Sequence, residues 1–268
     1  MSYIIETALE LVCVYSFVAL ALFLSFRILD IADLTTDGCF VLGMCVSIVC
    51  TLNNHPLLGI FMGMVSGGLA GLVTALLQTK LGVPSILAGI VTNTALYTIN
   101  LMVMGFSSNI SILRNKTIFN GNKLLLLVLI VVVAMILLRY FLSTRLGLSI
   151  RATGDNIDMV SASSINPKAC ILIGLVMSNM LTGLGGALAG QLQKSADINA
   201  GNGIVTIGLA TLIIGETVIN GKKSITRNII ACLIGNIIYR LIYAFILQTH
   251  IIPIECLKLM TALIITLA

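Results

Sequence analysis

Carboxylates and carboxamides that stand among long apolar runs are the side chains of this sequence best suited to bind a polar solute. Asp37 lies in the polar cluster "DLTTDG" (33–38), and Asn93 and Asn179 lie inside apolar runs. Polar groups in such surroundings are costly unless they face water, a partner or a helix end. We expect Asp37, Asn93 and Asn179 to line a polar pathway. The alternative for Asp37 is to cap the run that begins there, and for the two asparagines it is hydrogen bonding between helices.

No spacing of side chains indicates a catalytic or metal site. His55 and His250 stand beside prolines without the partners that a hydrolase needs, and the seven cysteines form no C-x-x-C pair. The stretch "GETVINGKKS" (215–224) resembles a phosphate-binding loop. Five residues separate its glycines instead of that motif's four, and a second lysine replaces the serine or threonine. We predict no catalytic residues, no metal and no ATPase site in this chain, and therefore no enzyme.

The composition defines the class of protein. The chain has 268 residues, of which 58% are hydrophobic and 9% charged, and its mean hydropathy is +1.11. Soluble domains carry roughly 25% charged residues. Apolar runs of about the 20 residues that cross a bilayer recur along the chain, too continuous for the alternating strands of a membrane barrel. The sequence predicts an all-α polytopic membrane protein with one transmembrane domain, residues 1–268.

About nine membrane segments are predicted, and two of them are short. The second and the seventh begin beside the polar clusters "DLTTDG" (33–38) and "ADINAGNG" (196–203), which indicates broken helices of the kind that border solute sites. Glycine at every fourth position from Gly59 to Gly71 predicts close helix packing. The expected segments are 3–26, 38–52, 57–79, 84–104, 123–142, 168–192, 203–219, 225–247 and 254–268.

The two short segments begin with similar sequences. Residues 32–48 and 196–213 share an Ala-Asp start and two glycines five residues apart, and one inserted residue brings them into register. The two copies would cross the membrane in opposite directions, so they indicate an inverted repeat of the transporter kind. Two unrelated glycine-rich helix starts are the alternative.

Lysine and arginine, which accumulate in cytoplasmic loops, predict the orientation. If the N-terminus is external, more of the lysines and arginines lie on the cytoplasmic side than outside. This orientation also places residues 151–168 and the C-terminus in the cytoplasm. An even number of spans would overturn this assignment. The net charge of +5 follows from the same bias, and no basic run with interleaved aromatics indicates a nucleic-acid partner.

Four motifs resemble those of a known family. They are "DLTTDGCFVLG" (33–43), "GVPSILAGIVTNTAL" (82–96), "RATGDNIDMVSASSINPK" (151–168) and "GGALAG" (185–190). In this order they resemble permease subunits of bacterial ABC importers, in the branch that includes branched-chain amino acid and ribose permeases. The short chain and "LTTDG" are most similar to permeases for tryptophan and tyrosine uptake.

The resemblance implies a role for the polar stretch in the middle of the chain. In such permeases the corresponding cytoplasmic segment, here about 144–167, is a coupling helix that docks on a separate ATPase subunit. Its serine-rich middle, "MVSASSIN" (159–166), departs from the family pattern. The residues that the resemblance places near this contact are Arg151, Gly154, Asp155, Asn156, Ala162, Ser164 and Asn166.

The resemblance also implies partners and a location. The protein would be the permease of an ATP-driven importer in the bacterial plasma (inner) membrane, paired with a second copy as a homodimer. Cytoplasmic ATP-binding subunits would bind ATP and Mg, and an extracytoplasmic substrate-binding protein would deliver the solute. We expect an aromatic or related amino acid first, with branched-chain amino acids, nucleosides and pentoses open.

An ion-coupled secondary transporter is the competing class, because it too has inverted repeats and broken helices. It would need buried ionisable residues for the coupling ion. Beyond Asp30, Asp33 and Asp37, the sequence offers mainly Glu216 and Arg240.

Overall fold

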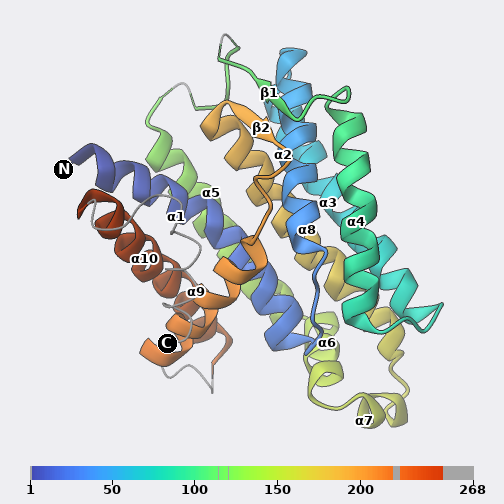
Figure 1. Ribbon diagram of the computed structural model, residues 1–268. Coiled ribbons are helices and arrows are strands. Elements are labelled where there is room, and N and C mark those ends of the chain that lie inside the picture. Colours follow the sequence, from blue (N-terminus) through green and yellow to red (C-terminus); the bar gives the residue numbers. More distant parts are fainter. Residues whose placement is uncertain (1, 114, 120, 220–223, 250–268) are drawn as a thin grey trace.

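A computed structural model describes residues 2–113, 115–119, 121–219 and 224–249, which form a bundle of helices (Figure 1). The first helix, α1 (Ser2–Leu22), continues as a turn of π-helix, η1 (Phe23–Ile28). The other helices are α2 (Thr36–Leu52), α3 (Pro56–Thr79), α4 (Ser85–Val103), α5 (Lys123–Ser143), α6 (Arg145–Asp155), α7 (Ile157–Ala162), α8 (Pro167–Gln193), α9 (Ile204–Val218) and α10 (Ile225–Thr249).

Among the described residues, six helices are long and apolar enough to cross a membrane. They are Glu6–Ile28, Pro56–Thr79, Ser85–Val103, Lys123–Ser143, Pro167–Gln193 and Ile225–Ile246. The apolar helices α2 and α9 are shorter, as the polar clusters before them predicted. Eight of the nine expected segments therefore correspond to helices. The ninth, 254–268, lies outside the described residues, so a total of nine is not established.

The bundle is built around α8, which packs against α1, α2 and α3. Glycines let α3 and α8 approach closely: a methyl group added at Gly67 would lie 2.9 Å from the Cα of Gly183. Small residues at such crossings replace the hydrophobic driving force that helices lack within lipid. The glycines from Gly59 to Gly71 therefore allow the close helix packing that their spacing predicted.

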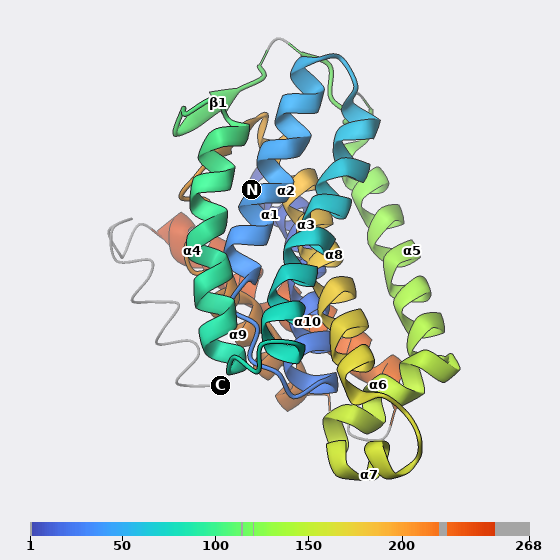
Figure 2. The ribbon, with the colours of Figure 1, turned by 90° about the vertical axis from the view of Figure 1, so that its right-hand side faces the viewer.

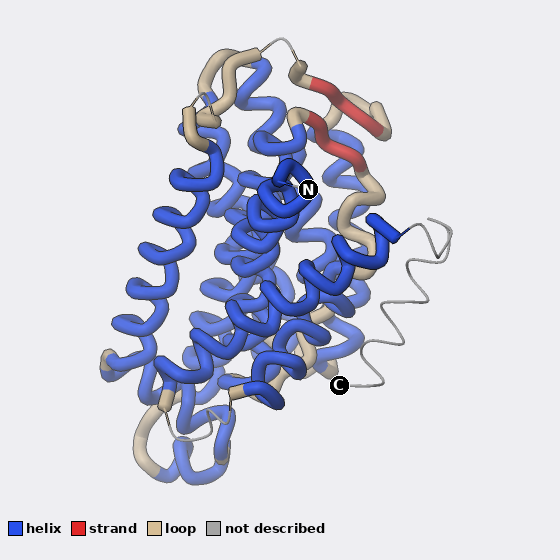
Figure 3. The backbone as a smooth tube through the Cα atoms, turned by 90° about the vertical axis from the view of Figure 1, so that its left-hand side faces the viewer, coloured by secondary structure: helices blue, strands red, loops and turns tan. Residues whose placement is uncertain are grey.

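The two ends of the bundle differ. At one end β1 (Asn109–Ser111) and β2 (Ser195–Asp197) form a two-stranded antiparallel sheet, with Ile110 opposite Ala196. Figure 3 shows this sheet at the end opposite the loops and short helices α6 and α7. We call these the sheet end and the α7 end.

The outer helices carry the apolar surface. α4 and α5 lie on different sides of the bundle (Figure 2). Both expose large apolar side chains, such as Leu87 and Ile90 on α4 and Leu129 and Leu137 on α5. Water would not tolerate a surface of this extent, whereas the hydrocarbon of a bilayer does. The molecule is therefore a membrane protein.

Candidate functional site

A polar cavity of about 270 Å³ lies between the start of α2, the middle of α4 and the loop that precedes α9. Two of the three expected pathway residues, Asp37 and Asn93, line it. The complete lining is Asp37, Gly38, Val41, Asn93, Thr94, Tyr97, Asn100, Ile198, Gly201 and Asn202. The cavity joins residues that are more than 100 positions apart in sequence.

Asp37 fixes the position of the loop before α9, which forms one wall of the cavity. Its Oδ1 accepts a hydrogen bond from the backbone N–H of Val205 at 2.8 Å, and its Oδ2 accepts one from Gly203 at 3.3 Å. Asp37 thus caps the N-terminus of α9 and not that of its own helix. A carboxylate at this position satisfies orphan backbone donors and offsets the positive end of the helix dipole.

The carboxamides of α4 point at the start of α2. Asn100 Nδ2 donates to the carbonyl oxygen of Gly38 at 3.3 Å, and a methyl group at Gly38 would lie 2.5 Å from Asn93 Oδ1. Asn100 Oδ1 is buried and accepts no hydrogen bond from any described residue. Both carboxamides therefore have hydrogen-bonding capacity left beside the cavity.

Sequence reasoning missed Tyr97, which stands on the same face of α4. Its side chain is 52% exposed and lines the cavity. Asn93, Tyr97 and Asn100 recur at the three- and four-residue spacing of one helix face. That spacing was visible in the sequence and identifies the polar face of α4.

Asn179, the third expected pathway residue, does not line this cavity. Its Nδ2 donates to Asp33 Oδ2 at 2.6 Å and to the carbonyl of Leu175 at 3.1 Å, and both Asn179 and Asp33 are fully buried. Asp33 Oδ1 also accepts from the backbone N–H of Thr35 at 2.9 Å. Asn179 therefore joins α8 to the segment before α2, which is the alternative that the sequence left open.

Helices α6 and α7 form the polar stretch at the α7 end. Asp155, Asn156, Ala162, Ser164 and Asn166 are exposed there, while Arg151 and Gly154 are half-buried. Two of these side chains cap helices. Asn156 Oδ1 accepts from the N–H of Met159 at 3.0 Å at the start of α7, and Asn166 Oδ1 accepts from Lys168 at 3.1 Å at the start of α8.

Two apolar side chains of α7 are exposed beside those polar residues. Ile157 is 52% exposed and Met159 is 57% exposed, whereas Val160 is buried. Sequence reasoning missed Ile157 and Met159, since a short amphipathic turn does not reveal which apolar residue faces inward. Together, Ile157 and Met159 form a small apolar surface within the polar stretch at the α7 end.

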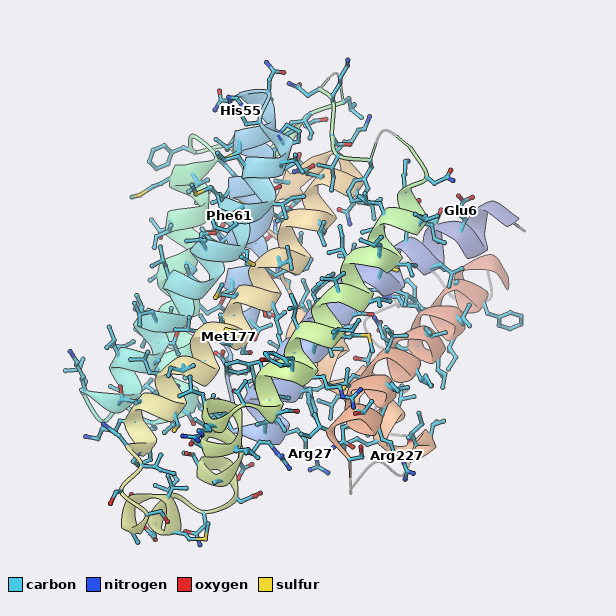
Figure 4. The ribbon with its side chains drawn as sticks, turned by 180° about the vertical axis from the view of Figure 1, so that it is seen from behind. Glu6, Arg27, His55, Phe61, Met177 and Arg227 are labelled. Carbon is cyan, nitrogen blue, oxygen red and sulfur yellow. The ribbon has the colours of Figure 1, made fainter. Side chains whose placement is uncertain are left out.

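The remaining ionisable candidates have separate roles. Glu216 Oε1 lies 2.7 Å from Arg27 Nε in a partly exposed ion pair at the α7 end, where Figure 4 labels Arg27, far from His55. Asp30 is exposed. Arg240 is 6% exposed, and its guanidinium carbon lies 3.7 Å from the centre of the Tyr15 ring. Within the described ranges, no cluster of three His, Cys, Asp or Glu residues is placed to hold a metal.

The two similar sequences occupy corresponding places. Asp33 accepts a hydrogen bond from the N–H two residues ahead, and Asp197 does the same with Asn199 at 2.7 Å. The equivalent glycines make equivalent contacts, since Gly43 packs on α8 and Gly208 on α1.

The directions of the two short helices are opposite. Helix α2 runs toward the sheet end, whereas α9 runs from β2 toward Arg27 at the α7 end (Figure 1). Around them, α3 packs along α8, and α10 packs along α1. We call α1, α2 and α3 the first three-helix unit and α8, α9 and α10 the second.

Short inverted helices whose N-termini meet at a polar cavity inside an apolar bundle define a membrane transport protein. Comparison with known proteins gives the particular family. Residues 4–268 match the family described as the branched-chain amino acid transport system / permease component. The chain belongs to this family, so it is the permease component of an ABC-type transport system for small solutes and not an enzyme.

Individual relatives agree with this assignment. A tyrosine transport system permease protein of Clostridioides difficile (strain R20291) is 33% identical over 94% of this chain and 85% of its own length. An uncharacterised protein of Rickettsia prowazekii (strain Madrid E) is 32% identical over 98% of this chain and 95% of its own length. The D-allose transport system permease protein of Escherichia coli (strain K12) is 35% identical over 38% of this chain and 31% of its own length. No solved structure matches the chain significantly.

Proposed function

We propose that the protein is the membrane-spanning subunit of an ATP-driven importer, which moves its solute inward by alternating access. The observation that carries this proposal is the polar cavity at Asp37, Asn93 and Tyr97, in a bundle whose outer helices expose apolar side chains. It lies where α2 and α9 both begin. A solute bound there would be released to either side by a relative movement of the two three-helix units.

The preferred solute is an aromatic or related amino acid. The Clostridioides difficile relative is named as a permease protein of a tyrosine transport system. In this chain, the Tyr97 ring gives the cavity an aromatic surface on which a second ring can stack. The Asp37 carboxylate already occupies the positive end of α9 and lines the cavity, so its negative charge favours the ammonium group of an amino acid nearby.

The working unit is a homodimer. Thr94 and Tyr97 are exposed on a face of α4 that otherwise carries apolar side chains such as Ile90 and Val91. Polar groups at membrane depth are costly in contact with lipid. A second copy placed against this face would cover them and enclose the pathway between the two cavities.

The α7 end faces the cytoplasm and docks on ATP-binding subunits, which bind ATP and Mg. Ile157 and Met159 supply apolar contact area there, and the polar residues among those that the resemblance identifies, Arg151, Asp155, Asn156, Ser164 and Asn166, supply the rim. The N-terminus lies outside and the C-terminus inside the bacterial inner membrane. An extracytoplasmic binding protein delivers the solute at the sheet end.

One observation favours an ion-coupled secondary transporter instead. Asp33 is fully buried, and within the described residues no cation pairs with it. Buried carboxylates of this kind bind coupling ions in some transporters. In proteoliposomes, uptake that follows an imposed ion gradient without ATP would support that alternative and exclude the importer.

Co-purification tests the importer directly. The detergent-solubilised protein is isolated from its own cell, as wild type and as Ile157→Asp, Ala162→Arg and the control Ser108→Arg, which is exposed near the opposite end. We expect an ATP-binding protein to accompany wild type and the control, and to be lost from both α7 variants. If no ATPase accompanies wild type under conditions that preserve other transporter complexes, the proposal is wrong.

A further inference from the structure

Residues 28–37, which we call the connecting segment, run from the α7 end to the cavity without forming a regular helix until Thr36. They follow the π-helical turn η1, in which the N–H of Leu29 bonds to the carbonyl of Leu24 at 3.1 Å. Turns of π-helix occur mostly at functional sites. Asp30 then adopts a positive φ of 54°, which turns the chain toward α2.

The first end of the connecting segment is held by α6. A methyl group at Gly154 of α6 would overlap the carbonyl of Ile28, so the two backbones are in direct contact. Ile150, also on α6, shares a buried apolar cluster with Leu29, Ala75 and Leu175. Because packed side chains and touching backbones transmit displacement, α6 cannot shift without moving Ile28 and Leu29.

The middle of the connecting segment is fixed by polar contacts to two helices and by close packing on a third. Asp33 accepts the 2.6 Å hydrogen bond from Asn179 of α8, and the hydroxyls of Thr35 and Thr74 of α3 lie 2.9 Å apart. A methyl group at Gly89 of α4 would lie 2.8 Å from the backbone nitrogen of Leu34. The contacts leave little room for the connecting segment to bend independently.

The last residue of the connecting segment, Asp37, lines the cavity and holds the start of α9 through Val205 and Gly203. A displacement of α6 at Gly154 would therefore also displace Asp37 and the start of α9, where the two three-helix units meet. We infer that the connecting segment transmits movement of α6 to the cavity and to α9, with Thr35 and Asn179 as positioning residues. The inference rests on the proposed function, in which an ATPase moves α6.

Amide hydrogen exchange tests this link without any partner. Gly154→Val forces Ile28 away, whereas the control Ser149→Val places the same side chain on a partly exposed position of the same helix. If the connecting segment transmits, Gly154→Val raises the exchange rates of the Gly203 and Val205 amides by at least about fivefold, since their hydrogen bonds to Asp37 weaken. Unchanged rates in a folded Gly154→Val protein overturn the inference.

A milder pair of variants covers the case in which Gly154→Val does not fold. Thr35→Val removes the hydroxyl that contacts Thr74, and Thr79→Val is its control, because the Thr79 hydroxyl bonds only to Ala75 of its own helix at 2.7 Å. We expect faster exchange at Gly203 and Val205 in Thr35→Val alone. Equal exchange in both variants contradicts transmission.

Transport in vesicles separates this inference from the proposed function. With the co-purified ATPase, Thr35→Val should keep ATPase docking but lower the amount of tyrosine taken up per ATP by at least about threefold, while Thr79→Val matches wild type. A purely structural role would lower docking, hydrolysis and uptake together, and that result overturns the inference. If wild-type uptake needs no ATP, the proposed function fails, and the exchange rates still decide whether the connecting segment transmits.

Discussion

The backbone N–H of Val205, at the start of α9, donates a hydrogen bond of 2.8 Å to the carboxylate of Asp37, at the start of α2. The two residues belong to the two similar sequences, and the bond ties one copy to the other where the cavity opens. Both short helices therefore begin beside the cavity, and a carboxylate of one caps the other.

Removing this carboxylate should destabilise the start of α9. Asp37→Ala leaves two backbone donors without partners and should lower the free energy of unfolding by about 1–2 kcal/mol. Asp37→Asn keeps one acceptor but loses the charge next to the helix dipole, so it should cost less. Thermal unfolding in nanodiscs measures both, with the exposed Asp158→Ala as control. A melting temperature for Asp37→Ala equal to that of the control would contradict the capping role.

The crossing of α3 and α8 should not tolerate a single added methyl group. At Gly183 that group would overlap the carbonyl of Gly63 and lie 3.0 Å from the Cα of Gly67. Alanine improves helix propensity over glycine by about 1 kcal/mol, but overpacking at a close contact costs about 1–3 kcal/mol. The steric term should prevail, so Gly183→Ala should be less stable than wild type. Gly121→Ala, where nothing lies within 4 Å, should not be. Denaturation of both variants beside wild type checks this, and a stabilised Gly183→Ala would refute it.

The helices and the close packing of α3 were predictable from the sequence, because both follow from the length and the spacing of local residue patterns. Apolar length predicted nine membrane segments, eight of which correspond to described helices, and the glycines from Gly59 to Gly71 predicted where α3 is closely packed. The partner of each polar group was not predictable. Asp37 and Val205 are 168 positions apart, and only the tertiary fold shows that Asp37 caps α9, whereas Asn179 turns away from the cavity toward Asp33. Helix propensity and spacing carry no information on such distant pairs.

The buried guanidinium of Arg240 should depend on the aromatic ring below it. Its carbon lies 3.7 Å from the centre of the Tyr15 ring, and none of the residues that the structure describes accepts a hydrogen bond from its Nε or Nη2. A desolvated cation over an aromatic face gains about 2 kcal/mol. Tyr15→Phe keeps the ring and should unfold near the wild-type temperature, whereas Tyr15→Leu should be clearly less stable. Equal losses in the two variants would assign the effect to the hydroxyl instead of the ring.

The proposed homodimer predicts which face of the bundle meets a second copy. Tyr97 and Thr94 are polar or amphipathic groups on an α4 surface that is otherwise lipid-like, whereas α5, on a different side of the bundle (Figure 2), exposes almost only apolar side chains. If α4 faces α4 across a shared pathway, Tyr97→Cys should form a cross-linked dimer with a short bifunctional maleimide in native membranes. Tyr140→Cys at the exposed end of α5 should not. Both variants are made in a Cys50→Ser/Cys256→Ser background, because Cys50 is only partly buried and Cys256 lies outside the described residues. The background protein should give no dimer, since Cys13, Cys39, Cys45, Cys170 and Cys232 are buried. Electrophoresis without reductant measures the dimer fraction. Cross-linking at Tyr140 but not at Tyr97 would place the partner against α5 and leave the cavity facing lipid, which its polar lining makes energetically unfavourable.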